Sequence, residues 1–180
     1  LLHAIVALIN SFTICFTGPE CSGKSTLSEF VSDEFGATLI NEYARRYLTG
    51  LGRPYVKEDL RIIAKTQLGQ LIESISDKEI TVIDTGAEVV KVWCEVRFND
   101  DDQVIYELVQ RQHAIVDIYV LCKPDIPWEA DSFRESQFDR DRLYEIYKAF
   151  LEKEEVPFIE ISGELIQRKA DLTEAIKFLA

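Results

Sequence analysis

Residues 12–27 read FTICFTGPECSGKSTL, and this stretch decides the fold. It opens with an unbroken run of apolar and β-branched residues, Phe12–Phe16, which is typical of a buried strand. A glycine-containing loop follows, and after Lys24 the apolar residues take helical spacing as far as about Phe35. Strand, glycine loop and helix in this order form the context in which the motif G-x-x-x-x-G-K-[ST] holds a phosphate group.

The loop matches that motif at every specified position from Gly18 to Ser25. Gly18 and Gly23 permit backbone dihedrals that turn the amides inward into a concave anion site. The helix that begins near Lys24 adds the positive end of its dipole, and the Lys24 ammonium suits the β- and γ-phosphates. The Ser25 hydroxyl can complete a magnesium shell, so the motif predicts binding of ATP and Mg²⁺. The residues predicted to hold the nucleotide are Gly18, Pro19, Glu20, Cys21, Ser22, Gly23, Lys24, Ser25, Thr26 and, farther along, Arg140.

Apolar runs alternate with helical patterns along the rest of the chain. Further strands are predicted at residues 37–40, 80–84, 117–122 and 157–161, and further helices at residues 42–48, 60–75, 87–98, 104–113, 139–153 and 165–179. Strands that alternate with helices indicate parallel βαβ units. The strands are nearly continuous apolar runs, as expected where both faces of a sheet are covered. The pattern therefore predicts an α/β fold with helices on both faces of a parallel sheet.

The composition indicates one globular domain over residues 1–180, with residues 1–10 as an N-terminal extension. The 32 acidic residues outnumber the 20 basic ones, and the net charge of −12 repels nucleic-acid phosphates. The apolar run at residues 1–9 has no basic flank and is too short to span a bilayer. We expect a protein that binds neither nucleic acid nor membrane, and whether it forms a homo-oligomer is left open.

The four cysteines form no compact metal or disulfide pattern. Cys15 and Cys122 lie in strand-like runs, Cys94 lies in a helical run, and Cys21 lies inside the phosphate motif. This distribution indicates reduced thiols in a cytoplasmic protein. Cys21, close to a helix N-terminus, is either a redox-sensitive thiol or a small residue at a variable loop position.

Two carboxylates follow predicted strands at the edge of the sheet that also carries the phosphate motif. Glu42 follows the second strand and Asp84 ends the third. In open α/β sheets ligands bind at this carboxyl edge. One of the two carboxylates can accept a proton from an attacking hydroxyl, and the other can position magnesium. Helix capping is the alternative role for both, and the spacing leaves open which one is the base.

Residues 125–142 are polar and charged and are interpreted as a lid. This segment contains Arg134, Arg140 and Arg142. Arginines on a segment that closes over ATP can stabilise charge on the transferring phosphoryl group. Alternatively, the arginines that alternate with aspartates form an ordinary solvated helix start.

Several further side chains are candidates for substrate binding. Arg45 either holds a substrate or phosphate group or lies on a surface helix face. Tyr43, Tyr55 and Trp93 either stack on a flat ring or pack in the core. His113 is isolated at a predicted helix end and is interpreted as structural.

With these residues in place, the chain from Phe12 onward resembles the ribosylnicotinamide kinase domain of NadR-type NAD-biosynthesis proteins. The ordered set of motifs carries the resemblance: FTGPExSGKSTL at 16–27, EYAR at 42–45, IDT at 83–85, KVW at 91–93, PW at 127–128, Asp131, and RE at 134–135. The first block alone is shared with many P-loop proteins, whereas the ordered set is more specific.

The resemblance implies a three-layer α/β/α P-loop fold of the nucleotide-kinase type, with five parallel strands in the order 2-3-1-4-5. It also implies transfer of the γ-phosphate of ATP to the 5′-hydroxyl of nicotinamide riboside, which gives nicotinamide mononucleotide. By this likeness Lys24 and Ser25 hold ATP and magnesium, and Arg134 belongs to the lid. The acceptor pocket is expected to involve Glu42, Tyr43, Arg45, Asp84 and Trp93.

The sequence also departs from the family pattern. Neither an adenylyltransferase motif nor a helix-turn-helix is found, so adenylyl transfer and DNA binding are not expected of it. Asn41 stands where some members have an aromatic residue, and Cys21 stands where the family usually has serine. The alternative functions are a kinase for another nucleoside or deoxynucleoside, and a non-catalytic ATP-binding regulatory module.

Overall fold

The computed structural model describes residues 11–75, 79–130 and 137–179. In chain order its elements are β1 (Phe12–Thr17), α2 (Lys24–Phe35), β2 (Thr38–Ile40), α3 (Tyr43–Thr49), α4 (Lys57–Ser74), β3 (Ile80–Asp84), α5 (Ala87–Phe98), α6 (Gln103–His113), β4 (Ile118–Cys122), α7 (Arg140–Lys153), β5 (Phe158–Ile161) and α8 (Leu165–Leu179). The elements predicted from the sequence are therefore present. The predicted N-terminal extension and Arg134 lie outside the described residues.

One helix begins earlier than its apolar pattern indicates. α4 starts at Lys57, although helical spacing of apolar residues starts only at Leu60. The Asp59 carboxylate accepts a hydrogen bond from the backbone N–H of Val56 at 2.8 Å. A carboxylate in this position stabilises a polar first turn, which apolar periodicity does not detect.

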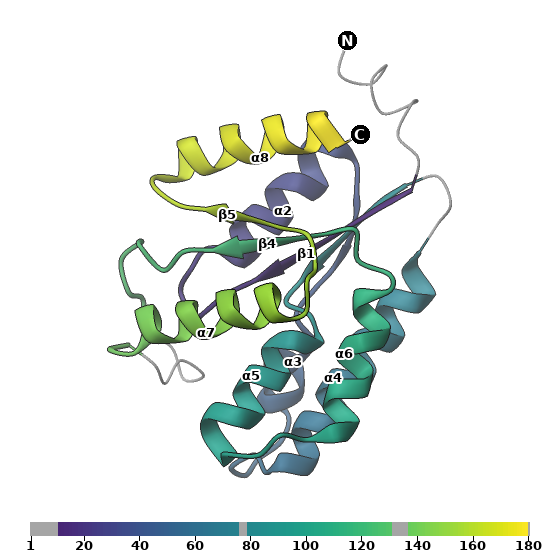
Figure 1. Cartoon of the computed structure of the whole chain (residues 1–180), viewed down its shortest axis with the longest axis vertical. Coiled ribbons are helices and arrows are strands. Elements are labelled where there is room, and N and C mark those ends of the chain that lie inside the picture. The colour runs from purple at the N-terminus through teal and green to yellow at the C-terminus, as the bar shows by residue number, and fades with distance from the viewer. Residues whose placement is uncertain (1–10, 76–78, 131–136, 180) are drawn as a thin grey trace.

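The sheet has five parallel strands in the order β2-β3-β1-β4-β5. Figure 1 shows α2 and α8 on one face of the sheet and α3, α4, α5, α6 and α7 on the other. This arrangement confirms the three-layer α/β/α fold and the strand order that the resemblance implies.

The core has two parts, one on each face of the sheet. Alternate residues of a strand point to opposite faces, so Ile14 and Phe16 of β1 pack with α2 and α8, whereas Cys15 packs with the helices of the other face. β4 alternates in the same way, with Val120 on the α2 and α8 side and Tyr119 on the other. Burial on both faces explains why the strands are apolar along their whole length.

The strand register brings the carboxyl ends of the strands together. Phe16 of β1 is paired with Asp84 of β3, and Thr17 is paired with Leu121 of β4. The loops that follow these strands therefore leave the same edge of the sheet, beside the phosphate motif. This edge is where ligands bind in open α/β sheets.

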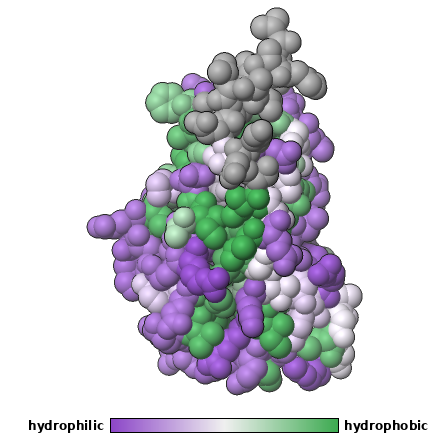
Figure 2. Space-filling view, turned by 90° about the vertical axis from the view of Figure 1, so that its right-hand side faces the viewer, coloured by the Kyte–Doolittle hydropathy of each residue, from purple (hydrophilic) through white to green (hydrophobic). Residues whose placement is uncertain are grey.

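Figure 2 shows one face, on which apolar residues gather in a strip between hydrophilic ones. Among the described residues, no helix combines the length and the apolar character needed to cross a membrane. The four cysteines are free thiols, and Cys15, Cys94 and Cys122 are buried.

Candidate active site

The phosphate loop joins β1 to α2 through a series of unusual backbone conformations. Gly18, Cys21 and Gly23 have φ values of 124°, 51° and 85°. At Gly18 a side chain is also excluded by contact, because a Cβ atom would lie 2.7 Å from the carbonyl oxygen of Cys122. Both the dihedral angle and the space thus require glycine at the first position of the motif.

The Lys24 ammonium lies at the mouth of this loop. It donates hydrogen bonds to the carbonyl oxygens of Gly18 at 2.9 Å and Pro19 at 2.7 Å. The Ser22 hydroxyl also donates to the Pro19 carbonyl, at 2.8 Å. α2 begins at Lys24 with no acidic residue in its first turn, so no side chain of that turn offsets the positive end of the helix dipole. The loop therefore combines a lysine charge and a helix N-terminus at one point.

A buried arginine of α8 holds the back of the phosphate loop. Arg168 is only 1% exposed, and its guanidinium donates to the carbonyl oxygens of Ser22 at 2.8 Å, Lys123 at 2.9 Å and Gly163 at 2.6 Å. It also forms an ion pair with the Asp125 carboxylate. Arg168 thereby joins three loops that follow β1, β4 and β5.

We expect Arg168→Gln to lower the free energy of unfolding by about 3 kcal/mol, because three carbonyl groups, among them that of the buried Ser22, and the Asp125 carboxylate lose a hydrogen-bond donor. Arg168→Lys should recover only part of this loss. A lysine ammonium lacks the planar, forked guanidinium that lets Arg168 donate to groups of three loops at once. Chemical denaturation of the variants measures both changes. The matched control is Lys169→Gln, because Lys169 only lies over the Phe30 ring at 4.7 Å. Equal stability of the Arg168 variants and the control would contradict this assignment.

The phosphate loop opens onto a cavity of about 310 Å³. Its floor is formed by residues of the loop and of the start of α2, including Gly18, Lys24 and Ser25. Glu42 and Trp93 line the same cavity. The remaining lining residues are Glu20, Cys21, Ser22, Gly23, Thr26, Arg45, Leu48, Thr85, Val89, Ile126, Pro127, Glu129 and Tyr147. One cavity thus brings the predicted phosphate site together with most of the predicted acceptor site.

Glu42 precedes α3 and lines the same cavity as the phosphate loop. Burial raises the pKa of its carboxyl above the ordinary value, the positive charge of Lys24 opposes this rise, and the negative charge of Asp84 adds to it. Arg45 lies one helical turn away, with its Nε 4.0 Å from the Glu42 carboxylate. A carboxyl with a raised pKa at a cavity wall has the properties of a general base.

Asp84 occupies a different position. It ends β3 and is only 4% exposed, and it is not among the residues that line the cavity. The hydroxyl of Thr85 donates to its carboxylate at 3.4 Å. Its charge nevertheless influences Glu42, so the two predicted carboxylates lie close enough to interact. Glu42 is thus among the residues that line the cavity, whereas Asp84 is buried next to Thr85, which lines it.

The segment after β4 contacts the phosphate loop through both backbone and side chains. Arg140, the first residue of α7, donates to the carbonyl oxygens of Cys21 at 3.0 Å and Ile126 at 3.1 Å, and its guanidinium lies over the Trp128 ring at 5.5 Å. The Cys21 thiol contacts the backbone of Glu129, whose N–H donates to Sγ at 3.2 Å. The first part of the predicted lid is therefore joined to the loop.

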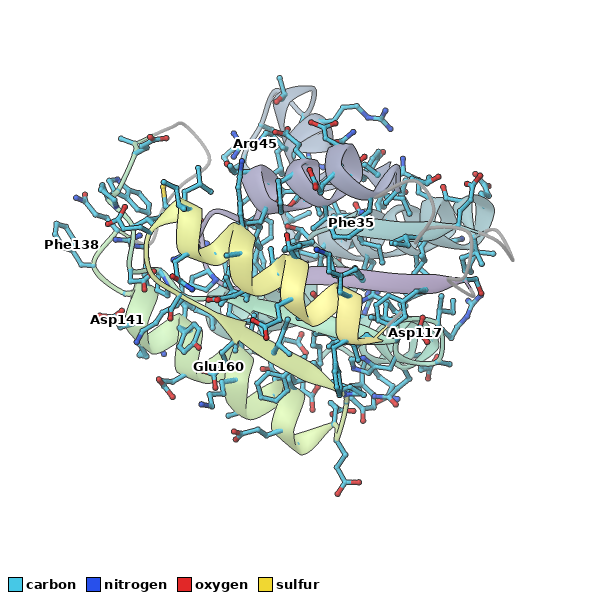
Figure 3. The ribbon with its side chains drawn as sticks, turned by 90° about the horizontal axis from the view of Figure 1, so that it is seen from above. Phe35, Arg45, Asp117, Phe138, Asp141 and Glu160 are labelled. Carbon is cyan, nitrogen blue, oxygen red and sulfur yellow. The ribbon has the colours of Figure 1, made fainter. Side chains whose placement is uncertain are left out.

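Two other described residues of the predicted lid, Phe138 and Arg142, are exposed and lie at the surface. Phe138 is 96% exposed, and Figure 3 shows it projecting away from the rest of the molecule, at the opposite end of the sheet from Asp117. Arg142 binds the neighbouring Asp139 carboxylate at 2.7 Å, as in the alternative interpretation of a solvated helix start. Arg134 remains a prediction, because it lies outside the described residues.

The aromatic candidates separate into two groups. Trp93 lines the cavity and stacks on Tyr55, with ring centroids 5.8 Å apart. Tyr43 lies outside the lining of this cavity, its backbone N–H donates to Gln67, and its ring packs under the Arg46 guanidinium. Of the aromatic side chains considered from sequence, Trp93 is therefore the one positioned to meet a ring in the cavity.

Several residues of the site carry no signal in the sequence. Tyr147 of α7 and Val89 of α5 line the cavity, yet both fit the ordinary apolar spacing of a helix. Arg168 likewise occupies an unremarkable position in a helical pattern. Thr85 alone offered a clue, because it directly follows the strand end at Asp84 and so lies at the carboxyl edge of the sheet.

A family model described as an AAA domain matches residues 13–168. Curated relatives include the trifunctional NAD biosynthesis/regulator protein NadR of Escherichia coli (strain K12), which is 26% identical over 160 residues, and that of Salmonella typhimurium (strain LT2), which is 23% identical over 157 residues. The matches cover 84% and 83% of this chain but 38% of each relative. The chain therefore spans well under half the length of the curated relatives it matches.

Solved structures of kinases share the fold. A NadR protein in complex with NR has a TM-score of 0.76 at 19% identity, with 92% of this chain and 50% of that chain covered. Deoxyadenosine kinase from M. mycoides, solved with dCMP and dCDP, has a TM-score of 0.65 at 15% identity, with 93% and 100% covered. Thymidylate kinase from Ehrlichia chaffeensis has a TM-score of 0.66 at 18% identity, with 96% and 100% covered. The fold is thus the one that these nucleoside and nucleotide kinases use.

Proposed function

Since the chain belongs to the AAA domain family and carries a complete phosphate loop, we propose that it is an ATP-dependent kinase of a small nucleoside-like molecule. The favoured acceptor is nicotinamide riboside, phosphorylated on its 5′-hydroxyl to nicotinamide mononucleotide. One observation carries the proposal: the phosphate loop and a carboxylate suited to act as a base, Glu42, line one cavity, and the charge of Lys24 acts on that carboxylate. A kinase needs both groups within reach of one bound pair of substrates.

ATP binding rests on the loop from Gly18 to Thr26. Its backbone amides and the N-terminus of α2 form the anion site, and Lys24 adds a full positive charge for the terminal phosphates. Arg140, bonded to the loop through the Cys21 carbonyl, holds the start of α7 beside this site. The chain's contribution to phosphoryl transfer is thus positioning and charge stabilisation.

Magnesium fits the donor groups at this site. Oxygen donors suit this ion, and the candidates are the Ser25 hydroxyl in the cavity and the Asp84 carboxylate at the end of β3. Among the described residues no cluster of three or more carboxylate, histidine or cysteine side chains surrounds a metal position. Phosphate oxygens and water would therefore supply most of the shell, as is usual for Mg²⁺ in kinases. The ion would neutralise phosphate charge in the transfer.

We assign the base to Glu42. Its position on the cavity wall places it where an acceptor hydroxyl would approach the phosphate loop, and burial raises the pKa of its carboxyl. Arg45 and Trp93 line the same cavity and suit the ribose and the flat ring of a nucleoside. The names of the curated relatives, and the NadR protein solved with NR, support nicotinamide riboside as the acceptor.

The test is ADP release by the purified protein with ATP and Mg²⁺ against a panel of nucleosides and deoxynucleosides that includes nicotinamide riboside. We expect nicotinamide riboside to give a kcat/KM about 100-fold above that of the other acceptors, because the ring-binding groups discriminate among bases. Detection of nicotinamide mononucleotide by mass spectrometry confirms that the phosphate has reached the acceptor rather than water.

The other outcomes decide between the alternatives. A deoxynucleoside as the best acceptor would support the second candidate, which the likeness to deoxyadenosine kinase over the whole length of that enzyme favours. Tight ATP binding without acceleration by any acceptor would support a non-catalytic regulatory module and would contradict the proposed activity.

A further inference from the structure

The turn from Asp84 to Gly86, which joins β3 to α5, is the most constrained part of the site after the phosphate loop. Thr85 has a φ of 72°, a conformation that is strained for a β-branched residue. Gly86 allows no side chain, because a Cβ atom would lie 2.8 Å from the sulfur of Cys15 and 2.5 Å from the side-chain nitrogen of Gln112. Such a conformation persists only where the surroundings hold it.

Gln112, at the end of α6, provides this support. It is 1% exposed, and its side-chain oxygen accepts a hydrogen bond from the backbone N–H of Ala87 at 2.8 Å. Gly86, the N-cap of α5, offers no side chain to cap the helix. Gln112 thus caps the start of α5 from α6, a role that a serine or aspartate at the N-cap position commonly has.

The side-chain nitrogen of Gln112 also has an acceptor for each of its two hydrogens. It donates to the Glu88 carboxyl at 2.6 Å and to the Tyr119 hydroxyl at 3.0 Å. The amide fits in one orientation only, since the opposite orientation would place its oxygen against Glu88 and its N–H group against that of Ala87. The hydrogen bonds therefore fix both the side chain and the turn that it caps.

A chain of buried polar groups extends this support into the core. The Tyr119 hydroxyl of β4 lies 2.8 Å from Nδ1 of His113. Burial lowers the pKa of His113, and burial also raises the pKa of Glu88, although the hydrogen bond from Gln112 lowers it in part. A buried polar network of this kind is stable in the core as long as its members remain paired.

We propose that Gln112 is a positioning residue that fixes the turn from Asp84 to Gly86, and through it the Asp84 carboxylate, for phosphoryl transfer. This role rests on the proposed kinase function. Gln112 itself is not among the residues that line the cavity, so it acts through the turn and not on a substrate.

The experiment compares Gln112→Ala with Gln110→Ala, an exposed residue of the same helix that bonds to Glu154. We expect Gln112→Ala to lower kcat by about 30-fold and to leave the KM for ATP within about twofold, because the turn moves while the phosphate loop does not. Amide hydrogen exchange at residues 85–89 should become about 10-fold faster, because the helix start loses its cap. Gln110→Ala should change none of these quantities.

An exchange of the two side chains provides the rescue. Gln112→Glu alone places a second carboxyl against Glu88, so kcat should fall as in Gln112→Ala. The double variant Glu88→Gln with Gln112→Glu restores an amide facing a carboxylate, and we expect kcat to return to within about threefold of the original. If Gln112→Ala does not fold, the comparison of Gln112→Glu with the double variant tests the positioning role in its place.

The possible failures are distinguishable. Unchanged kcat in a folded Gln112→Ala protein, or no recovery in the double variant, would overturn the positioning role. If the unmodified protein phosphorylates no acceptor, the proposed function fails instead. Hydrogen exchange at residues 85–89 then still decides whether Gln112 fixes the turn, and unchanged exchange would overturn that claim.

Discussion

Replacing Lys24 with alanine is expected to lower kcat for phosphoryl transfer by about 1,000-fold, because the full positive charge at the mouth of the phosphate loop is lost. Among the described residues, the ammonium donates to the carbonyl oxygens of Gly18 and Pro19, and both belong to the loop itself. The substitution therefore removes charge without exposing a distant part of the core. ADP release measures kcat, and calorimetric titration measures ATP affinity.

The control for this variant is Lys65→Ala. Lys65 is an exposed lysine of α4, so its loss removes the same charge from the protein outside the cavity. We expect its kcat and its melting temperature to match those of the unmodified protein. A Lys24→Ala protein that remains folded and keeps near-normal turnover would show that the assigned phosphate role is wrong.

Glu42→Gln is expected to lower kcat by about 1,000-fold while ATP affinity stays unchanged, because an amide cannot accept the proton of the acceptor hydroxyl. The raised pKa of Glu42 adds a pH dependence. A base acts as the carboxylate, so activity should fall as the pH is lowered through this pKa. The fall should begin at a higher pH than for a glutamate with the ordinary value of 4.5. This fall in activity at low pH is the acid limb of the pH profile. The residual activity of Glu42→Gln should lack it.

Asp84→Asn is the paired variant, since it removes one charge from the other carboxylate. Because we assign Asp84 to magnesium, it should raise the Mg²⁺ concentration for half-maximal activity by about 10-fold and keep the acid limb of the pH profile. Kinetics across pH and Mg²⁺ concentration separate the two roles. An acid limb that persists in Glu42→Gln and disappears in Asp84→Asn would reverse the assignment.

The sequence by itself determined the fold class and the place of the site. The motif from Gly18 to Ser25 is local, and each of its residue types has a backbone or charge requirement that the spacing alone reveals. The apolar strands alternate with helical patterns, which predicts a parallel sheet covered on both faces. Strands of one direction end at one edge, so the position of Glu42 and Asp84 after their strands was sufficient to bring them near the loop.

Only the tertiary structure determined which role each side chain of the site can take. It places Glu42 among the residues that line the cavity and buries Asp84 outside that lining, although both follow strands in the same way. It also shows that Arg168 and Gln112, which look ordinary in helical patterns, support two loops of the site from distant helices. Local periodicity reports which face of an element is buried. It does not report which polar groups meet there, because those contacts join residues far apart in the chain and depend on packing of the whole domain.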